Sequence, residues 1–170
     1  MRRSLLIICC LLSANLQAQT MTPIEFNNWM ADISDSLFYK GQNWGGRLGD
    51  LHESGDYQQL KSSRENIQTF IDASIAQVKS APEVGEGSNV LANAMLNYLY
   101  YERKLVKEAF MPFESLTLES TDEDFKKVVD NLTMLAEDEG FELAKLNNAQ
   151  NAYAAKNGFS IEPVKEEEVK

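Results

Sequence analysis

The sequence has few of the residues that carry most enzymatic and metal chemistry. Its 170 residues include two cysteines and a single histidine, His52. A di-iron helical bundle needs two Glu-x-x-His pairs, which one histidine cannot provide, and no Cys/His spacing of a zinc site is present. A glycine-rich phosphate loop and a nucleophile elbow are also missing. We therefore expect no enzyme activity, no cofactor and no metal, and we interpret His52 as a solvated histidine rather than a loose metal ligand.

Long apolar runs are missing too, except at the N-terminus, over residues 5–12. Arg2 and Arg3 precede this run, as in the positively charged region of a secretory signal, and the run is too short to span a membrane. Leu16 and Ala18 fit the two positions that signal peptidase reads before its cleavage site. We therefore expect a signal peptide that is removed after Ala18.

Cleavage at this point removes residues 1–18, and both cysteines, Cys9 and Cys10, go with them. The mature chain would begin at Gln19 and have no thiol for a disulfide or for thiolate chemistry. Its expected location is the periplasm or the outer cell surface. The alternative is a lipid anchor through Cys10, but the residues around the two cysteines make a poor lipidation motif.

Positive charge is also scarce. The chain has 16 Lys and Arg against 26 Asp and Glu, a formal charge of −10, and losing the two arginines of the signal changes it to −12. Such a surface repels nucleic acid and anionic lipid, and it favours a cationic partner or plain solubility.

The 152 residues left after cleavage suit one domain with its own core. We expect this domain over residues 19–159 and an acidic mobile tail over residues 160–170.

The first expected helix begins at Thr22, where Pro23 and Glu25 complete a capping box. Apolar positions spaced alternately by four and three residues extend it to about Glu53. A break near Gly45-Gly46 is the alternative, because each glycine costs a helix about 1 kcal/mol relative to alanine. The positions on the expected buried stripe are Phe26, Met30, Ile33, Leu37, Gly41, Trp44, Leu48 and Leu51.

Three further helices follow from the same reasoning. The second is expected over residues 57–80, and the third begins at Ser88 or Asn89 and is ended or kinked by Pro112. The fourth begins among the acids and caps of residues 120–124 and ends at Asn157-Gly158. Short connections join neighbours that run in opposite directions, so we expect an all-α, antiparallel up-down-up-down four-helix bundle without a transmembrane span.

Two carboxyl groups occupy the apolar stripes of the third and fourth helices. Glu102 falls between Tyr98 and Leu105, and Glu139 falls between Leu135 and Leu146. Counting rise per residue from the predicted turns places both carboxyls at nearly the same height. They are expected at the rim or in a structural ion pair, with Lys40 as one base that would neutralise them; a shared proton and a ligand or cation site are the alternatives.

Two other features have a possible binding role. Gly41, Gly45 and Gly49 form a bare strip beside Trp44, which indicates close helix packing or a local break, with a ligand groove as the less favoured alternative. Tyr98, Tyr100 and Tyr101 occupy more than one helix face, so at least one is expected at the surface. Together with Trp44, these tyrosines are the candidate ligand-binding or partner surface.

Two segments carry a resemblance to a known family. With the exported N-terminus and the long opening helix, residues 97–103 (Asn-Tyr-Leu-Tyr-Tyr-Glu-Arg) and residues 150–159 (Gln-Asn-Ala-Tyr-Ala-Ala-Lys-Asn-Gly-Phe) resemble a family of small bacterial surface proteins first named from a leptospiral protein. The resemblance implies a helical bundle with a surface or periplasmic location, and it implies no activity. The expected function is therefore an exported, non-catalytic binding or structural module with an unknown protein or small-molecule partner; the alternative is a small-molecule or metal-binding bundle that uses Glu102 and Glu139.

Overall fold

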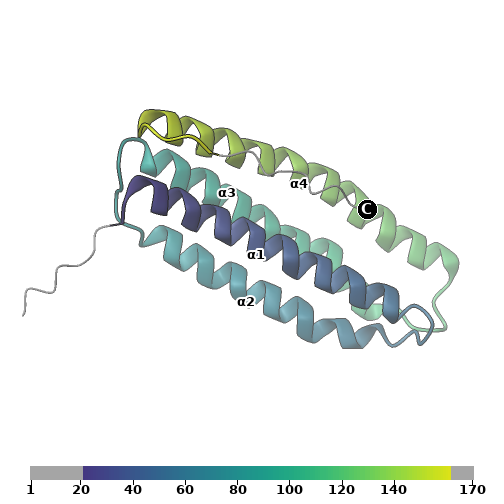
Figure 1. Cartoon of the computed structure of the whole chain (residues 1–170). Coiled ribbons are helices and arrows are strands. Elements are labelled where there is room, and N and C mark those ends of the chain that lie inside the picture. Colours follow the sequence, from purple (N-terminus) through teal and green to yellow (C-terminus); the bar gives the residue numbers. More distant parts are fainter. Residues whose placement is uncertain (1–20, 162–170) are drawn as a thin grey trace, which may run out of the picture.

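The computed structural model describes residues 21–161. The expected signal peptide and most of the expected tail lie outside the described residues. Within them the protein is all-helical, with four long helices and no strand, as expected. Figure 1 shows these helices lying alongside one another. They are α1 (Pro23–Asp50), α2 (Leu60–Lys79), α3 (Ser88–Leu105) and α4 (Asp122–Lys156).

Helix α1 begins as its sequence predicts and runs without a break. The hydroxyl of Thr22 accepts a hydrogen bond from the backbone N–H of Glu25, whose carboxylate accepts one from the N–H of Thr22 in return. The helix then continues through Gly45 and Gly46 to Asp50, so the predicted continuity is correct. Burial of the apolar stripe on its inner face stabilises the helix against the low propensity of its glycines.

The end of α3 differs from the prediction. The α-helix stops at Leu105 and continues as a π-helical turn, η2 (Val106–Phe110), and a 3-10 segment, η3 (Met111–Ser115), rather than reaching Met111. Pro112 has no N–H, so the carbonyl group of Glu108, four residues earlier, has no helical donor. That carbonyl accepts a 2.7 Å hydrogen bond from Nδ2 of Asn131 on α4 instead.

Helix α4 is attached to the rest of the molecule at both ends. Near its start Phe125 packs against the rings of Tyr57 and Phe113. Near its end the hydroxyl of Tyr153 donates to the carbonyl of Val84, and Asn157 exchanges two 3.0 Å hydrogen bonds with the backbone of Glu86. The resembling segment at residues 150–159 therefore holds the loop between α2 and α3.

The middle of α4 is packed less fully than its ends. Helix α4 lies chiefly against α3 and has far fewer contacts with α1. Between the buried side chains of Leu135 and Leu146 it buries no complete apolar side chain, and Glu139 and Leu143 are only partly covered. This loosely packed stretch is where α1 and α4 leave space between them. None of the helices within residues 21–161 combines the length and the hydropathy needed to cross a membrane.

Candidate ligand-binding site

A cavity of about 330 Å³ lies between α1 and α4, open to solvent on one side. Its volume is at the lower end of the range for small-molecule sites, about 300 Å³ and above. Helices α1 and α4 form its walls, and α2, α3 and η2 supply the remaining side chains. Its lining residues are Leu37, Phe38, Gly41, Gln42, Trp44, Gly45, Ile67, Glu102, Leu105, Phe110, Leu132, Ala136 and Glu139.

The glycines on α1 leave space rather than allowing a close helix contact. A Cβ atom added to Gly41 or Gly45 would meet no atom within 4 Å, and the same holds for Gly49. The favoured expectation, close packing or a break, is therefore wrong for this strip. The less favoured groove describes Gly41 and Gly45, which line the cavity, but not Gly49, which is exposed outside it.

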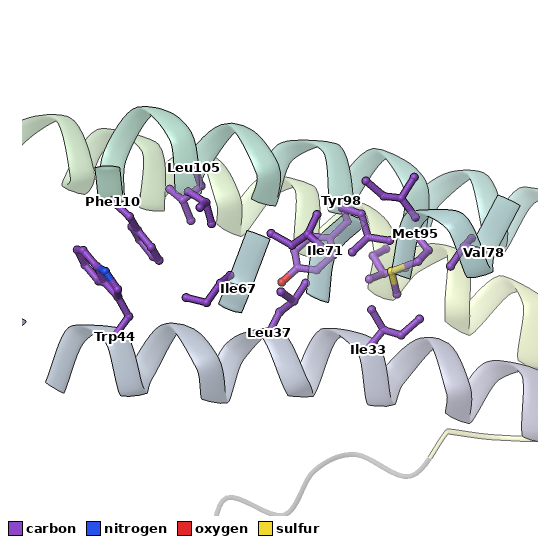
Figure 2. Packing of buried hydrophobic residues seen from close by; sticks show 14 of the residues in the cluster. Ile33, Leu37, Trp44, Ile67, Ile71, Val78, Met95, Tyr98, Leu105 and Phe110 are labelled. Atoms are coloured by element: carbon purple, nitrogen blue, oxygen red, sulfur yellow. The ribbon is translucent and has the colours of Figure 1, made fainter. Parts of the chain in front are cut away.

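Trp44 is a core residue that closes one end of the cavity. Its side chain is only 2% exposed, so the expected exposed partner surface at Trp44 is wrong. Its ring stacks on Phe110 with centroids 4.0 Å apart and an angle of 5° between the planes, as Figure 2 shows for the two facing side chains. Its Nε1 is buried without a hydrogen-bond acceptor in the described structure.

The structure brings Glu102 and Glu139 together at this cavity. Glu102 is 6% exposed, and its Oε1 atom is buried without a hydrogen-bond donor. Burial and, next, the charge of Glu139 raise the pKa of Glu102 to about 8, against which the interaction with Tyr98 acts more weakly. Burial and the neighbouring carboxylate thus both favour the protonated form of Glu102.

Tyr98 supports Glu102 from within the core. It is buried, contrary to a role at the surface, and it lies one turn before Glu102 on α3. Burial raises the pKa of Tyr98 far above its ordinary range, and the carboxyls of Glu102, Glu139 and Asp35 raise it further. The phenol hydroxyl of Tyr98 therefore keeps its proton at physiological pH, beside Glu102.

Lys40 does not neutralise the carboxyl pair. Its Nζ atom donates a 3.0 Å hydrogen bond to Oδ1 of Asn66 and lies over the ring of Phe70, both on α2. The expectation that it faces Glu102 and Glu139 is wrong, because α2 offers its side chain a nearer acceptor. No lysine, arginine or histidine of residues 21–161 lines the cavity.

The remaining tyrosines do not form a surface patch. Tyr101 is half-buried and donates a 2.7 Å hydrogen bond to the carbonyl of Leu135, which joins α3 to α4. Burial, chiefly, raises the pKa of Tyr101 to about 12. Tyr100 is 41% exposed, with the cationic groups of Lys79 and Arg103 over its ring. Of the four aromatic candidates, Tyr100 is the exposed one.

His52 lies at the loop end of the molecule, away from the carboxyl pair. Its Nδ1 lies 3.3 Å from the hydroxyl of Tyr57, and its ring packs on Phe125 at 5.6 Å between centroids. It borders an open hollow of about 490 Å³ between loops. No cluster of three or more potential metal ligands occurs in the described part of the chain.

Several cavity residues were missed by the reasoning from sequence. Phe110 and Leu132 reach the cavity because the π-helical turn moves Phe110 toward Trp44 and because the middle of α4 lies apart from α1. Pro112 was the one available signal, since a proline four residues after a helical carbonyl forces a local rearrangement.

No protein-family model, curated protein sequence or solved structure matches the chain. What the site can do must therefore be argued from its own chemistry. It presents an apolar wall, a carboxyl pair and a buried indole N–H. An apolar cavity with a few polar groups is the usual form of a site that holds a small organic molecule.

Proposed function

We propose that the protein is an exported, non-catalytic binding protein of the periplasm or outer cell surface, and that its ligand site is the cavity between α1 and α4. One observation carries this proposal: Glu102 Oε1 on α3 and Trp44 Nε1 on α1 are buried without partners and belong to residues that line this cavity. Export rests on the N-terminal segment and on the resemblance to the bacterial surface family.

The two unpartnered atoms favour a bound ligand on energetic grounds. A buried polar group without a hydrogen bond costs about 1–3 kcal/mol, and such groups are rare in native proteins. A hydrogen-bond donor on a ligand would remove the penalty at Glu102, and an acceptor, where the ligand has one, would remove the penalty at Trp44. Its apolar part would cover the exposed apolar wall, in which Phe38 remains 61% exposed.

The surroundings of the carboxyl pair support binding rather than catalysis. Glycoside hydrolases also place an acid of raised pKa beside a second carboxylate. A sugar ring, however, needs many polar partners, and apolar side chains and glycines make up most of this lining. Apart from its two glutamates, the lining contains no side chain that acts as a nucleophile, because serine, threonine, cysteine, lysine and histidine are all missing from it.

We also propose that the four helices run up-down-up-down, each antiparallel to its neighbour in sequence. The short connections between α1 and α2 and between α2 and α3 support this arrangement, as do the contacts of α2 with α1 and α3 and of α3 with α4. In this arrangement Glu102 on α3 and Glu139 on α4 approach the same level from opposite ends of the molecule.

The proposal is tested by filling the cavity. Gly41→Leu places a side chain in the cavity, whereas Gly46→Leu, on the same helix and equally free of neighbours, does not line it. Both changes raise helix propensity, so neither is expected to unfold α1. With Trp29→Phe as background, Trp44 is the remaining tryptophan and reports binding through its fluorescence.

The probe is 1-aminoanthracene, a neutral dye that brightens in apolar sites. We expect saturable binding with a change in Trp44 emission, abolished by Gly41→Leu and kept by Gly46→Leu. Equal binding to both leucine variants, or no binding to the parent, would contradict the proposed site.

A further inference from the structure

We propose that the cavity between α1 and α4 takes an apolar amine in its ammonium form, with the charged nitrogen between the carboxyls of Glu102 and Glu139 and the apolar body against Trp44 and Phe38. This inference rests on the proposed function and assigns its class of ligand. It is carried by the geometry of the cavity, whose mostly apolar lining includes two acids, one of which has a buried oxygen atom without a hydrogen-bond donor.

The signs of the surrounding charges favour a cation. Two acids line the cavity, Glu139 on α4 and Glu102 on α3, and Tyr98 interacts with Glu102. The lining residue from α2 is the apolar Ile67. Asp35 on α1 adds a further negative charge near Tyr98. No cationic side chain of the described residues lines the cavity, so a carboxylate or phosphate ligand would meet repulsion without compensation.

The number and kind of donors favour an organic cation over a metal ion. Calcium takes six to eight oxygen ligands, and magnesium keeps an octahedron of oxygens and waters. Two carboxyls and the amide of Gln42, among leucine, phenylalanine and alanine side chains, do not supply such a shell, and no group of three His, Cys, Asp or Glu residues that could hold a metal occurs within residues 21–161. An ammonium group needs only two or three acceptors for its N–H bonds, which the carboxyl oxygens of Glu102 and Glu139 provide.

Proton exchange follows from this arrangement. In the cavity without an amine, Glu102 keeps a proton at neutral pH, since burial and the charge of Glu139 oppose its ionisation. An ammonium nitrogen beside the pair favours the carboxylate form, so binding releases the proton of Glu102 to solvent. The affinity for an amine therefore rises as the pH is raised from 6 to 8, below the pKa near 10 of an alkylammonium group.

Ligands of one length and three charges test the proposal directly. Octylamine, octan-1-ol and octanoate share an eight-carbon body and carry a positive, a zero and a negative charge at pH 7. Binding is followed by calorimetry and by Trp44 emission in the Trp29→Phe background. We expect octylamine to bind about tenfold more tightly than octan-1-ol, the ratio that one charge-assisted hydrogen bond supplies, and octanoate to bind most weakly.

Carboxamide variants locate the charge that makes the selection. The double variant Glu102→Gln/Glu139→Gln should remove the preference for octylamine over octan-1-ol, because no ionisable carboxyl is then left in the lining, and Glu102→Gln alone should remove the rise in affinity between pH 6 and pH 8. Glu137→Gln is the matched control, because Glu137 is an exposed residue of α4 that does not line the cavity. It should bind as the parent does.

Each other outcome has a definite meaning. If octan-1-ol binds as tightly as octylamine, or if the double variant Glu102→Gln/Glu139→Gln keeps the preference, the ammonium site is wrong while ligand binding in the cavity stands. If none of the three ligands binds, and 1-aminoanthracene also fails to bind, the proposed function is wrong as well. Tight octylamine binding that Gly41→Leu leaves unchanged would place the amine elsewhere and overturn the inference.

Discussion

The rings of Trp44 and Phe110 stack in parallel at 4.0 Å, although one lies on α1 and the other on the π-helical turn after α3. A regular α-helix continued past Leu105 would turn Phe110 differently, because a π turn adds a residue to the repeat. The local irregularity next to Pro112 thus joins α1 to the end of α3. It also builds one end of the cavity wall.

Truncating the stack should cost much stability. Phe110 is buried, so we expect Phe110→Ala to lower the free energy of unfolding by about 3 kcal/mol, as is typical for a large core side chain replaced by alanine. Urea denaturation measures this change, and Trp44 emission should shift to longer wavelength. Phe141→Ala removes an exposed ring of α4 and should stay within about 0.5 kcal/mol of the parent. Equal losses in the two variants would contradict the role of the stack.

The stability of the protein should depend on pH through Glu102. The pKa of Glu102 is about 8 in the folded protein against an ordinary value of 4.5, so the folded state holds this proton more tightly than the unfolded chain. The contribution of Glu102 is fully favourable below pH 4.5 and is lost as the pH rises toward 8, with a slope of at most about 1.4 kcal/mol per pH unit.

Glu102→Gln imitates the protonated side chain and should remove this dependence. We expect the variant and the parent to have equal stability near pH 4.5, and the variant to be more stable above pH 8. Denaturation at several pH values measures the difference, in which the contributions of other acids cancel. A parent that stays as stable as the variant at pH 8 would show that Glu102 is not held in a desolvated site.

The start of α4 should depend on its cap. The hydroxyl of Thr121 accepts from the N–H of Asp124, whose carboxylate accepts from Thr121 in return. We expect Thr121→Ala to destabilise the protein by about 1 kcal/mol. Thr133→Ala, in the middle of the same helix, removes only a hydroxyl bonded to the carbonyl of Val129 and should be neutral or slightly stabilising. Chemical denaturation of both variants measures the difference in their free energies of unfolding. A larger loss of stability in Thr133→Ala than in Thr121→Ala would contradict the role of the cap.

The other end of α4 should loosen when Asn157 is removed. Asn157→Ala loses both side-chain hydrogen bonds to Glu86, and we expect a loss of about 1–2 kcal/mol. Hydrogen exchange should show faster exchange for the last turns of α4 and for the loop at residues 80–87. The control is Asn148→Ala, an exposed asparagine on the same helix. Unchanged exchange at the loop in Asn157→Ala would mean that Tyr153 alone holds this end.

Features that depend on neighbouring residues were predictable from the sequence. The capping boxes at Thr22 and Thr121 need only residues three positions apart, and both are present. The left-handed stop at Gly158 is likewise a local property. The buried stripes followed from periodicity, and rise per residue sufficed to bring Glu102 and Glu139 to one cavity.

Features that depend on the rotation and spacing of helices were not predictable. The side chain of Lys40 donates a hydrogen bond to Asn66 on α2. Periodicity does not define how α2 is rotated about its axis, so this partner was not predictable. The glycine strip has two outcomes, close packing or open space, and the distance between α1 and α4 decides between them. Trp44 lay on the predicted buried stripe of α1, so the sequence pattern predicted its burial. A role at the surface conflicted with that pattern.

The most direct test of the central claim is a methyl NMR titration of the protein with octylamine. The account predicts saturable shifts of the methyl groups of Leu37, Leu105 and Leu132, which line the cavity, with little change at Leu91, a core residue that does not. Unchanged spectra at Leu37, Leu105 and Leu132, or shifts of equal size at Leu91, would contradict it.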